Sequence, residues 1–175
     1  MTTPGTITPR VRPADRSRLA RYDTSFAKAL ETAASEYNST DFQVLDIALE
    51  GEAGPSLDLS DTWSCREIKI GGLLLLTAYA PCSCAIVQIE PNICDIEKTT
   101  GSQRFKGTLQ YGGSRVLYRG VGYVTGRPAV NYATLSPHDQ TPVEPGQTVA
   151  QVGYFEHFKK SGPTDVAKPD IRKRF

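Results

Sequence analysis

Arginine is the residue type with the clearest binding chemistry near the start of the chain. Residues 9–22, PRVRPADRSRLARY, hold five arginines and no lysine: Arg10, Arg12, Arg16, Arg18 and Arg21. A guanidinium can bind phosphate through two parallel hydrogen bonds, whereas a lysine ammonium acts as a point charge. The stretch is therefore predicted to contact nucleic acid, an anionic lipid surface or a neighbouring subunit.

A second basic cluster lies at the other end of the chain. The residues there that we predict to make the same contacts are Lys159, Lys160, Arg172, Lys173 and Arg174. The net charge is +2 over residues 1–40, −7 over 41–100 and +6 over 101–175, although the whole chain carries only +1. Such a distribution concerns partners rather than folding, and the acidic segment offers a surface to the basic arm of a second copy.

Cysteine and histidine do not form a metal or nucleophile pattern. Cys82 and Cys84 have a single residue between them, which is closer than the usual C-x2-4-C zinc spacing. The other cysteines and both histidines are distant. We therefore predict no metal, no cofactor and no catalytic residue. The first thirty residues hold no apolar run typical of an export signal, so reduced and buried cysteines are expected.

An alternative is a monomeric β domain, either a binding protein or a hydrolase, with its site in the loops near residues 126–145. His138 lies there in the polar stretch SPHDQTP. No G-x-S-x-G motif is present, and YGGSRV at 111–116 is better explained as a hairpin turn. The sequence therefore favours a non-enzymatic, self-assembling protein over a monomeric binding protein or hydrolase.

An arm and one helix are predicted to precede the body of the protein. Residues 1–14 contain three prolines and no apolar periodicity, which is typical of an extended arm. Over residues 15–37, apolar side chains such as Leu19, Tyr22 and Phe26 recur every three or four positions. That spacing predicts one helix.

Alternating apolar and polar residues predict a β body over residues 42–158. In the first run, FQVLDIALE, Leu45, Ile47 and Leu49 share one parity. Similar runs follow, separated by turns rich in Gly and Pro, and seven or eight strands with no helix between them favour an antiparallel β-sandwich or jelly-roll-like fold. Residues 15–158 would then be a single globular domain, followed by a basic tail at 159–175.

The whole outline, an arm rich in Arg and Pro before a β domain rich in Thr and Gly, resembles jelly-roll coat proteins of small RNA viruses. The resemblance implies a self-assembling capsid protein that contacts RNA non-specifically through its basic ends and resides in the virion and the host cytoplasm. The outline also resembles the matrix proteins of some negative-strand viruses, which polymerise at a membrane surface. Both resemblances imply a homo-oligomer, and the residues leave the choice between them open.

Overall fold

Helices precede strands along the chain. The computed structural model describes residues 10–50, 52–53, 60–71, 73–112, 114–138, 148–159 and 171–174. The helices are α1 (Pro13–Ala20), α2 (Tyr22–Ala34), α3 (Thr40–Leu49) and the short 3-10 helix η1 (Tyr132–Thr134). The strands are β1 (Glu52–Ala53), β2 (Asp61–Cys65), β3 (Ile68–Ile70), β4 (Leu76–Ala78), β5 (Cys82–Glu90), β6 (Ile93–Lys98), β7 (Gln103–Tyr111), β8 (Val116–Val124), β9 (Val149–Lys159) and β10 (Ile171–Arg174).

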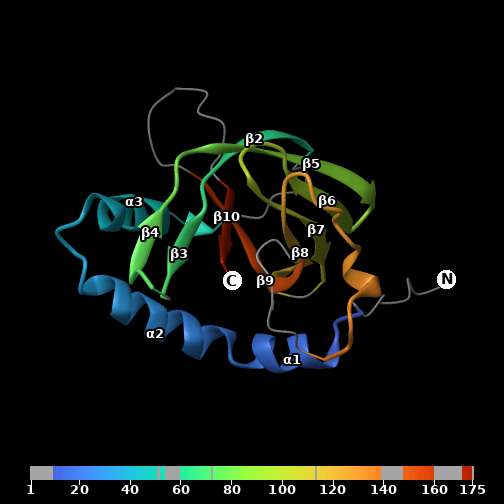
Figure 1. Cartoon of the computed structure of the whole chain (residues 1–175), viewed down its shortest axis with the longest axis horizontal. Helices are drawn as coiled ribbons and strands as arrows, with labels where there is room; N and C mark the ends of the chain where they lie inside the picture. Colours follow the sequence, from blue (N-terminus) through green and yellow to red (C-terminus); the bar gives the residue numbers. More distant parts are fainter. Residues whose placement is uncertain are drawn as a thin grey trace.

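Most of these strands form one sheet that closes on itself. The strand order is β1-β9-β10-β2-β5-β6-β7-β8, and β9 also pairs with β8. The eleven-residue strand β9 can do this because residues 149–155 pair with β8 and residues 154–157 pair with β10. Every pairing is antiparallel except that of β10 with β2. The mainly β, antiparallel architecture is confirmed, but the predicted two-layer sandwich or jelly roll is not, because the strands curve into a single closed sheet (Figure 1).

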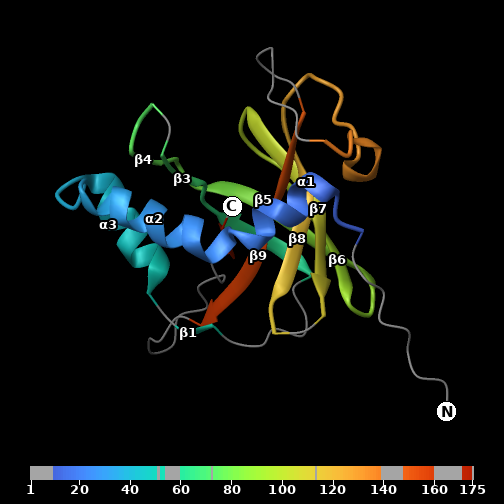
Figure 2. The same ribbon diagram turned by 90° about the horizontal axis from the view of Figure 1, so that it is seen from below.

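Apolar side chains at alternating positions of the strands fill the inside of the closed sheet. On β7, for example, Phe105 and Leu109 are buried. The buried members of this core are Trp63, Cys65, Cys84, Ile86, Cys94, Ile96, Phe105, Leu109, Tyr118 and Phe155. Polar residues of the opposite parity face outward, which leaves the outer surface of the sheet available for the N-terminal segment (Figure 2).

A pair of glycines makes room for Tyr118, the largest fully buried side chain among the described residues. Gly107 on β7 lies directly opposite Gly120 on β8. A Cβ at Gly107 would lie 2.7 Å from the ring of Tyr118, and one at Gly120 would lie 2.8 Å from the Gly107 Cα. Since Tyr118 is fully buried, any side chain at either glycine would displace it or push the strands apart.

A smaller core joins the helices to the hairpin of β3 and β4. Ala33 of α2, Leu45 of α3 and Leu76 of β4 are its buried members. The prediction that residues 42–49 form a strand was wrong. Ser39 caps α3 by accepting a hydrogen bond from the Phe42 amide at 3.1 Å, and Phe42, Leu45 and Leu49 pack on the core at helical spacing, whereas Ile47 is 60% exposed.

The predicted N-terminal helix is divided in two. α1 ends at Ala20 and α2 begins at Tyr22, with Arg21 (φ −99°, ψ 5°) between them. α2 ends at Ala34 rather than near Tyr37, which is 65% exposed. The extended arm also ends earlier than predicted, because Pro13 already occupies the first position of α1, where its missing N–H costs nothing.

The predicted C-terminal tail is in part a strand. β10 pairs antiparallel with β9, placing Arg172 opposite Glu156 and Arg174 opposite Tyr154. Residues 160–170 and residue 175 lie outside the described residues, as do residues 1–9 of the arm.

The expectation that all cysteines are reduced is not met. Cys65 on β2 and Cys84 on β5 form a disulfide with a Cα–Cα distance of 6.1 Å, and Cys82 and Cys94 are free thiols. The bond is possible because β2 and β5 pair side by side, which the spacing of the cysteines did not reveal. In the described part of the chain, no helix is long and apolar enough to cross a membrane.

Candidate functional site

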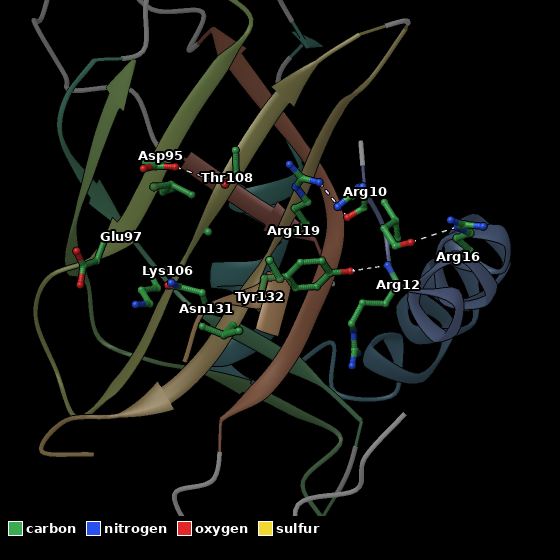
Figure 3. Close-up of a pocket in the computed structure, with 15 residues that line it drawn as sticks. Arg10, Arg12, Arg16, Asp95, Glu97, Lys106, Thr108, Arg119, Asn131 and Tyr132 are labelled. Carbon is green, nitrogen blue, oxygen red and sulfur yellow. Dashed lines mark hydrogen bonds between the residues drawn. The ribbon is translucent and has the colours of Figure 1, made fainter. Parts of the chain in front are cut away.

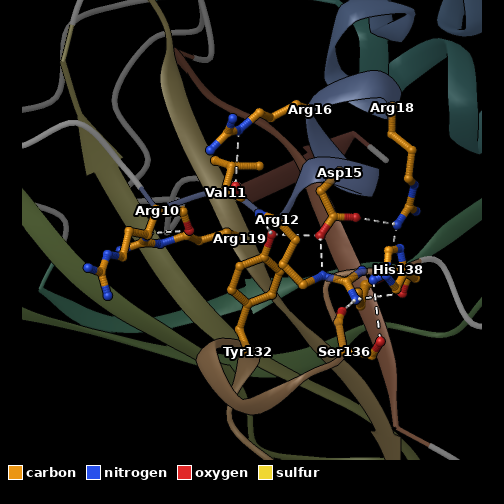
Figure 4. Close-up of polar contacts among 11 residues, drawn as sticks. Arg10, Val11, Arg12, Asp15, Arg16, Arg18, Arg119, Tyr132, Ser136 and His138 are labelled. Atoms are coloured by element: carbon orange, nitrogen blue, oxygen red, sulfur yellow. Dashed lines mark hydrogen bonds and ion pairs between the residues drawn. The ribbon is translucent and has the colours of Figure 1, made fainter.

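The residues before α1 run across the outer face of the sheet. Arg119, which alternates with buried Tyr118 on β8, donates a hydrogen bond from Nη1 to the Arg10 carbonyl oxygen at 2.9 Å. The Arg12 amide donates to Tyr132 Oη at 3.2 Å, and the Arg12 guanidinium donates to the Ser136 carbonyl oxygen. The segment is extended at residues 10–12, as predicted, but it is bound to its own subunit (Figure 4).

A buried carboxylate anchors this segment. Asp15, on the first turn of α1, is completely buried. It accepts hydrogen bonds from Arg12 Nε at 2.7 Å, from Arg18 Nη1 at 3.1 Å and from Tyr132 Oη at 2.6 Å. Arg18 Nη1 lies 3.1 Å from the Ala150 carbonyl oxygen of β9 as well, so the group, named here the Asp15 cluster (Arg12, Asp15, Arg18, Tyr132), ties α1 to the sheet.

The contacts of the Asp15 cluster also set its charges. Burial alone would raise the pKa of Asp15, but the hydrogen bonds from Arg12 and Tyr132 and the charges of Arg12 and Arg18 outweigh it, so the pKa is lowered. The pKa of Tyr132 is raised by burial and by its hydrogen bond to the carboxylate. At neutral pH the cluster therefore holds an ionised Asp15, a neutral Tyr132 and two guanidinium ions.

The structure assigns different environments to the arginines that the sequence groups together. Arg12 and Arg18 bind Asp15 and backbone carbonyls of the same subunit through Arg12 Nε and Nη1 and through Arg18 Nη1. The Arg18 side chain remains 36% exposed. Arg10 and Arg16 line a cavity, which is described below. Arg21 lies exposed at the break between α1 and α2 and away from that cavity.

The described basic residues at the C-terminal end lie on two strands, β9 and β10. Lys159 ends β9 with its backbone opposite Glu52, while Arg172, Lys173 and Arg174 belong to β10 on the other edge of β9. Lys160 lies outside the described residues.

A cavity of about 730 Å³ lies between the N-terminal segment, the outer face of β6–β8 and the loop at 129–133. Five cationic side chains line it: Arg10 and Arg12 from the arm, Arg16 from α1, Lys106 from β7 and Arg119 from β8. Arg12 is paired with Asp15, which leaves the other four without a carboxylate partner among the described residues. We call this cavity, with those four side chains, the cationic pocket. Figure 3 shows Arg10, Arg16 and Arg119 toward α1, and Lys106 on the other side of Tyr132 toward Glu97.

None of these four cations has a carboxylate partner within 4 Å among the described residues. The hydrogen bonds they make are to backbone oxygens: Arg16 to Val11 at 3.2 Å, Lys106 to Ala129 at 3.4 Å and Arg119 to Arg10. Unpaired cations also occur singly on the surface, but here four share one cavity. Lys106 lies directly opposite Glu97 in the strand register, so the excess of positive charge that favours a bound anion lies mainly at Arg10, Arg16 and Arg119.

Two carboxylates occupy the side of the pocket farthest from α1. Asp95 and Glu97 both point outward from β6, where Asp95 accepts from Thr108 Oγ1 at 3.4 Å and Glu97 accepts from Tyr123 Oη at 2.9 Å (Figure 3). The strand register explains this order, because Asp95, Thr108 and Arg119 lie opposite one another on β6, β7 and β8. The pocket thus has a cationic end and an end that can accept hydrogen bonds.

Sequence reasoning found two members of the pocket and missed the others. Lys106 and Arg119 carried a usable signal, since each sits at an outward position of a predicted strand. The Asp15 cluster carried a weaker one, the spacing of three residues from Arg12 to Asp15 and from Asp15 to Arg18 on a helix. Nothing local in the sequence connects Tyr132 to Asp15, which is 117 positions away.

The comparisons with known proteins give a family and no functional parallel. The profile of a family described as "Domain of unknown function (DUF4893)" matches residues 8–159. That range includes the arm residues at the pocket, all three helices and the strands from β1 to β9. No curated protein and no solved structure matches the chain.

Proposed function

Since the chain belongs to the DUF4893 family, a domain of unknown function, we propose a role from its geometry: it is a binding protein for an anionic small molecule, held in the cationic pocket. The observation that carries the proposal is the convergence of Arg10, Arg16, Lys106 and Arg119 on one cavity without carboxylate partners among the described residues.

The chemistry of the four side chains favours phosphate as the anionic group. A guanidinium offers a planar fork of donors that matches two phosphate oxygens, and three of the four cations are arginines. Lys106 adds a compact positive charge from β7, on the outer face of the sheet. Hydrogen bonds to a charged group contribute about 1.5–3 kcal/mol each, so a few of them support specific binding.

The pocket is held in shape before a ligand arrives. Arg10 and Arg16 lie on either side of Arg12 and Asp15, whose buried ion pair fixes the arm and the first turn of α1 on the sheet. Lining residues fixed in this way lose little conformational freedom on binding, which improves affinity. We therefore assign a supporting role to Asp15 and Arg18, which do not line the cavity. Arg12 and Tyr132 hold the arm in place and also border the space for the ligand.

The size and the two ends of the cavity narrow the ligand class. A volume near 730 Å³ lies within the range of about 300–1,000 Å³ that is usual for small-molecule sites. Asp95 and Glu97 can accept hydrogen bonds from hydroxyl or amino groups at the far end. A nucleotide or a sugar phosphate, with its phosphate toward Arg10 and Arg16, satisfies both ends.

Calorimetric titration at low salt tests the proposal, with inorganic phosphate, pyrophosphate and a nucleoside monophosphate as probes. We expect binding that weakens with added salt, and a loss of roughly tenfold or more in affinity in Arg16→Gln and in Arg119→Gln. Arg127→Gln is the matched control, because Arg127 is an exposed arginine outside the pocket. Equal affinities in all three variants, or no binding of any probe, would contradict the proposal.

The capsid or matrix role predicted from the sequence stays a prediction, and the same variants bear on it. If a short single-stranded RNA or an anionic vesicle binds wild-type protein and is displaced by the monophosphate, the polymer uses the same pocket. If RNA binding is instead lost on replacing Arg172, Lys173 and Arg174 with Gln, and particle mass rises with RNA, the assembly prediction is favoured over the small-molecule proposal.

A further inference from the structure

Three cysteines meet on one side of the paired strands β2 and β5, away from the cationic pocket. Cys65 is disulfide-bonded to Cys84, and the Sγ atoms of Cys65, Cys82 and Cys84 all lie within 4.8 Å of one another. The Sγ of Cys82 is 3.1 Å from that of Cys65. A free thiol therefore lies in contact with one sulfur of a disulfide.

The strand register explains the meeting and offers a second pairing. Cys65 lies directly opposite Cys82 in the antiparallel pair, whereas Cys84 lies opposite Trp63. Because Cys82 and Cys84 are two residues apart, they face the same side of β5 as Cys65 faces on β2. The present disulfide is the diagonal one, and the cross-strand pair Cys65–Cys82 is also within disulfide reach.

The three sulfurs differ in access to solvent. Cys84 is completely buried and Cys65 is 6% exposed, while Cys82 is only partly buried. A reagent in solution therefore reaches Cys82 before it reaches either sulfur of the disulfide. Cys82 also donates its thiol hydrogen to the Cys65 carbonyl oxygen at 3.1 Å, which holds it beside the bond.

We propose that Cys65, Cys82 and Cys84 form a thiol–disulfide exchange site, through which external thiols and disulfides gain access to the buried Cys65–Cys84 bond. The Cys82 thiolate attacks Cys65 Sγ and a Cys65–Cys82 bond forms. The Cys65–Cys84 bond breaks, and Cys84 leaves as a thiolate that takes up the proton lost by Cys82. This step involves no net oxidation.

An external dithiol then completes the reduction. A thiolate of the dithiol attacks Cys82 Sγ in the exchanged bond, and Cys65 leaves as a thiolate. The second thiol of the reagent attacks the sulfur of its own mixed disulfide, closes a ring and releases Cys82. The reagent is oxidised by two electrons and the protein disulfide is reduced by two.

Exchange explains the cluster better than a metal does, because a buried ammonium lies beside it. Lys98 on β6 is 6% exposed and its Nζ donates to Glu67 Oε2 at 2.9 Å. Its positive charge acts on Cys82, where it favours a thiolate and disfavours a nearby metal cation. Burial, together with the charge of Glu67, outweighs Lys98, so the pKa of the Cys82 thiol is raised. Because the thiolate is the attacking species, exchange should accelerate as the pH rises toward that pKa.

The experiment follows reduction of the oxidised full chain by dithiothreitol at about pH 8, with acid quenching, alkylation and peptide mapping. We expect Cys82→Ser to slow loss of the disulfide roughly tenfold or more, because the reagent must then attack buried sulfurs directly. Cys94→Ser is the matched control: it removes the other free thiol, which lies outside the group of three, and should leave the rate unchanged. Equal rates in wild type and Cys82→Ser would overturn the proposal.

A second variant keeps the test decisive if Cys82→Ser folds poorly. Cys84→Ser retains only the cross-strand pair, and mild treatment with oxidised glutathione should yield a Cys65–Cys82 disulfide in the mapped peptides. In wild type incubated without reductant, some alkylation of Cys84 should accompany a matching Cys65–Cys82 bond. Absence of that bond in both samples would overturn the exchange site and would leave the anionic-ligand proposal untouched.

Discussion

Arg12 and Arg18 lie three residues to either side of Asp15 and are fixed by its buried carboxylate, whereas Arg10 and Arg16 face an open cavity. These four residues come from one stretch of nine and have the same side chain. Arg12 and Arg18 each pair with the buried carboxylate, although Arg18 is 36% exposed and Arg12 also lines the cavity. Arg10 and Arg16 have no carboxylate partner among the described residues. Position relative to one acidic residue, and not residue type, separates the arginines that pair with Asp15 from those that we propose bind an anion.

Removing the Asp15 carboxylate, which Arg12 and Arg18 share, should have the largest effect on stability. Asp15→Ala leaves Arg12 buried without its partner, which should lower the free energy of unfolding by about 3–5 kcal/mol. Urea unfolding monitored by circular dichroism measures this change. Limited trypsin digestion should also cleave faster at the arginines of the arm, because the segment is no longer tied to the sheet.

The control for this variant is a carboxylate whose ion pair is exposed. Asp23 pairs with Arg115 at 2.9 Å, but its side chain is 77% exposed. Asp23→Ala should therefore cost no more than about 1 kcal/mol. Equal losses in the two variants would show that burial of Asp15 is not what holds the segment in place.

Tyr132 tests the link between the arm and the distant loop with a smaller change. Tyr132→Phe removes the hydroxyl that donates to Asp15 at 2.6 Å and accepts from the Arg12 amide at 3.2 Å. The two groups lose a partner in a buried setting, so thermal and urea unfolding should show a loss of about 1–3 kcal/mol.

Tyr123→Phe serves as the comparison for that change. Its hydroxyl donates to Glu97 at 2.9 Å on the outer surface, where water can replace it. We expect a loss below about 0.5 kcal/mol. A larger loss in Tyr123→Phe than in Tyr132→Phe would contradict the assignment of Tyr132 to the anchor.

Acid titration tests whether Asp15 is ionised in the folded protein. The pKa of Asp15 is lowered in the folded protein, so its contribution to stability is complete above the unfolded value and is lost as the pH falls through the folded value. The free energy of unfolding of wild type should thus decrease below about pH 4, and less so in Asp15→Asn, whose amide does not titrate. Parallel pH profiles for the two proteins would argue against an ionised Asp15 in the fold.

The sequence predicted the strands more reliably than the residues that surround the pocket. Alternation along residues 104–111 and 114–124 reflects burial of one face, a local property, and both became strands of the sheet. The run at 42–49 misled because Phe42, Leu45 and Leu49 have helical spacing while Leu45, Ile47 and Leu49 alternate as in a strand. The Ser39 cap favours the helix. Sheet closure depends on β9 reaching both β8 and β10, which no local pattern reports.

The pocket and the cysteine site were out of reach for the same reason. Arg119 and Arg10 are 109 positions apart, and Cys65 and Cys84 are 19 positions apart, yet each pair is joined by strand or segment pairing. Composition identified the arginine-rich stretch but treated its members as equivalent. Only tertiary contacts divide them into anchors and ligand-facing residues.

The smallest expected effect on stability belongs to Arg10 and Arg16, the two arginines of this stretch that line the cavity without a carboxylate partner among the described residues. Arg10→Gln with Arg16→Gln removes two cations that have no carboxylate partner among the described residues, so the free energy of unfolding should change by no more than about 0.5 kcal/mol. The repulsion with Lys106 and Arg119 falls in this variant, which offsets part of any loss. The same double variant should lose affinity for a phosphate probe, whereas Arg12→Gln should lose stability first. If the double variant unfolds as readily as Arg12→Gln, the division of this segment into anchors and binding residues does not hold.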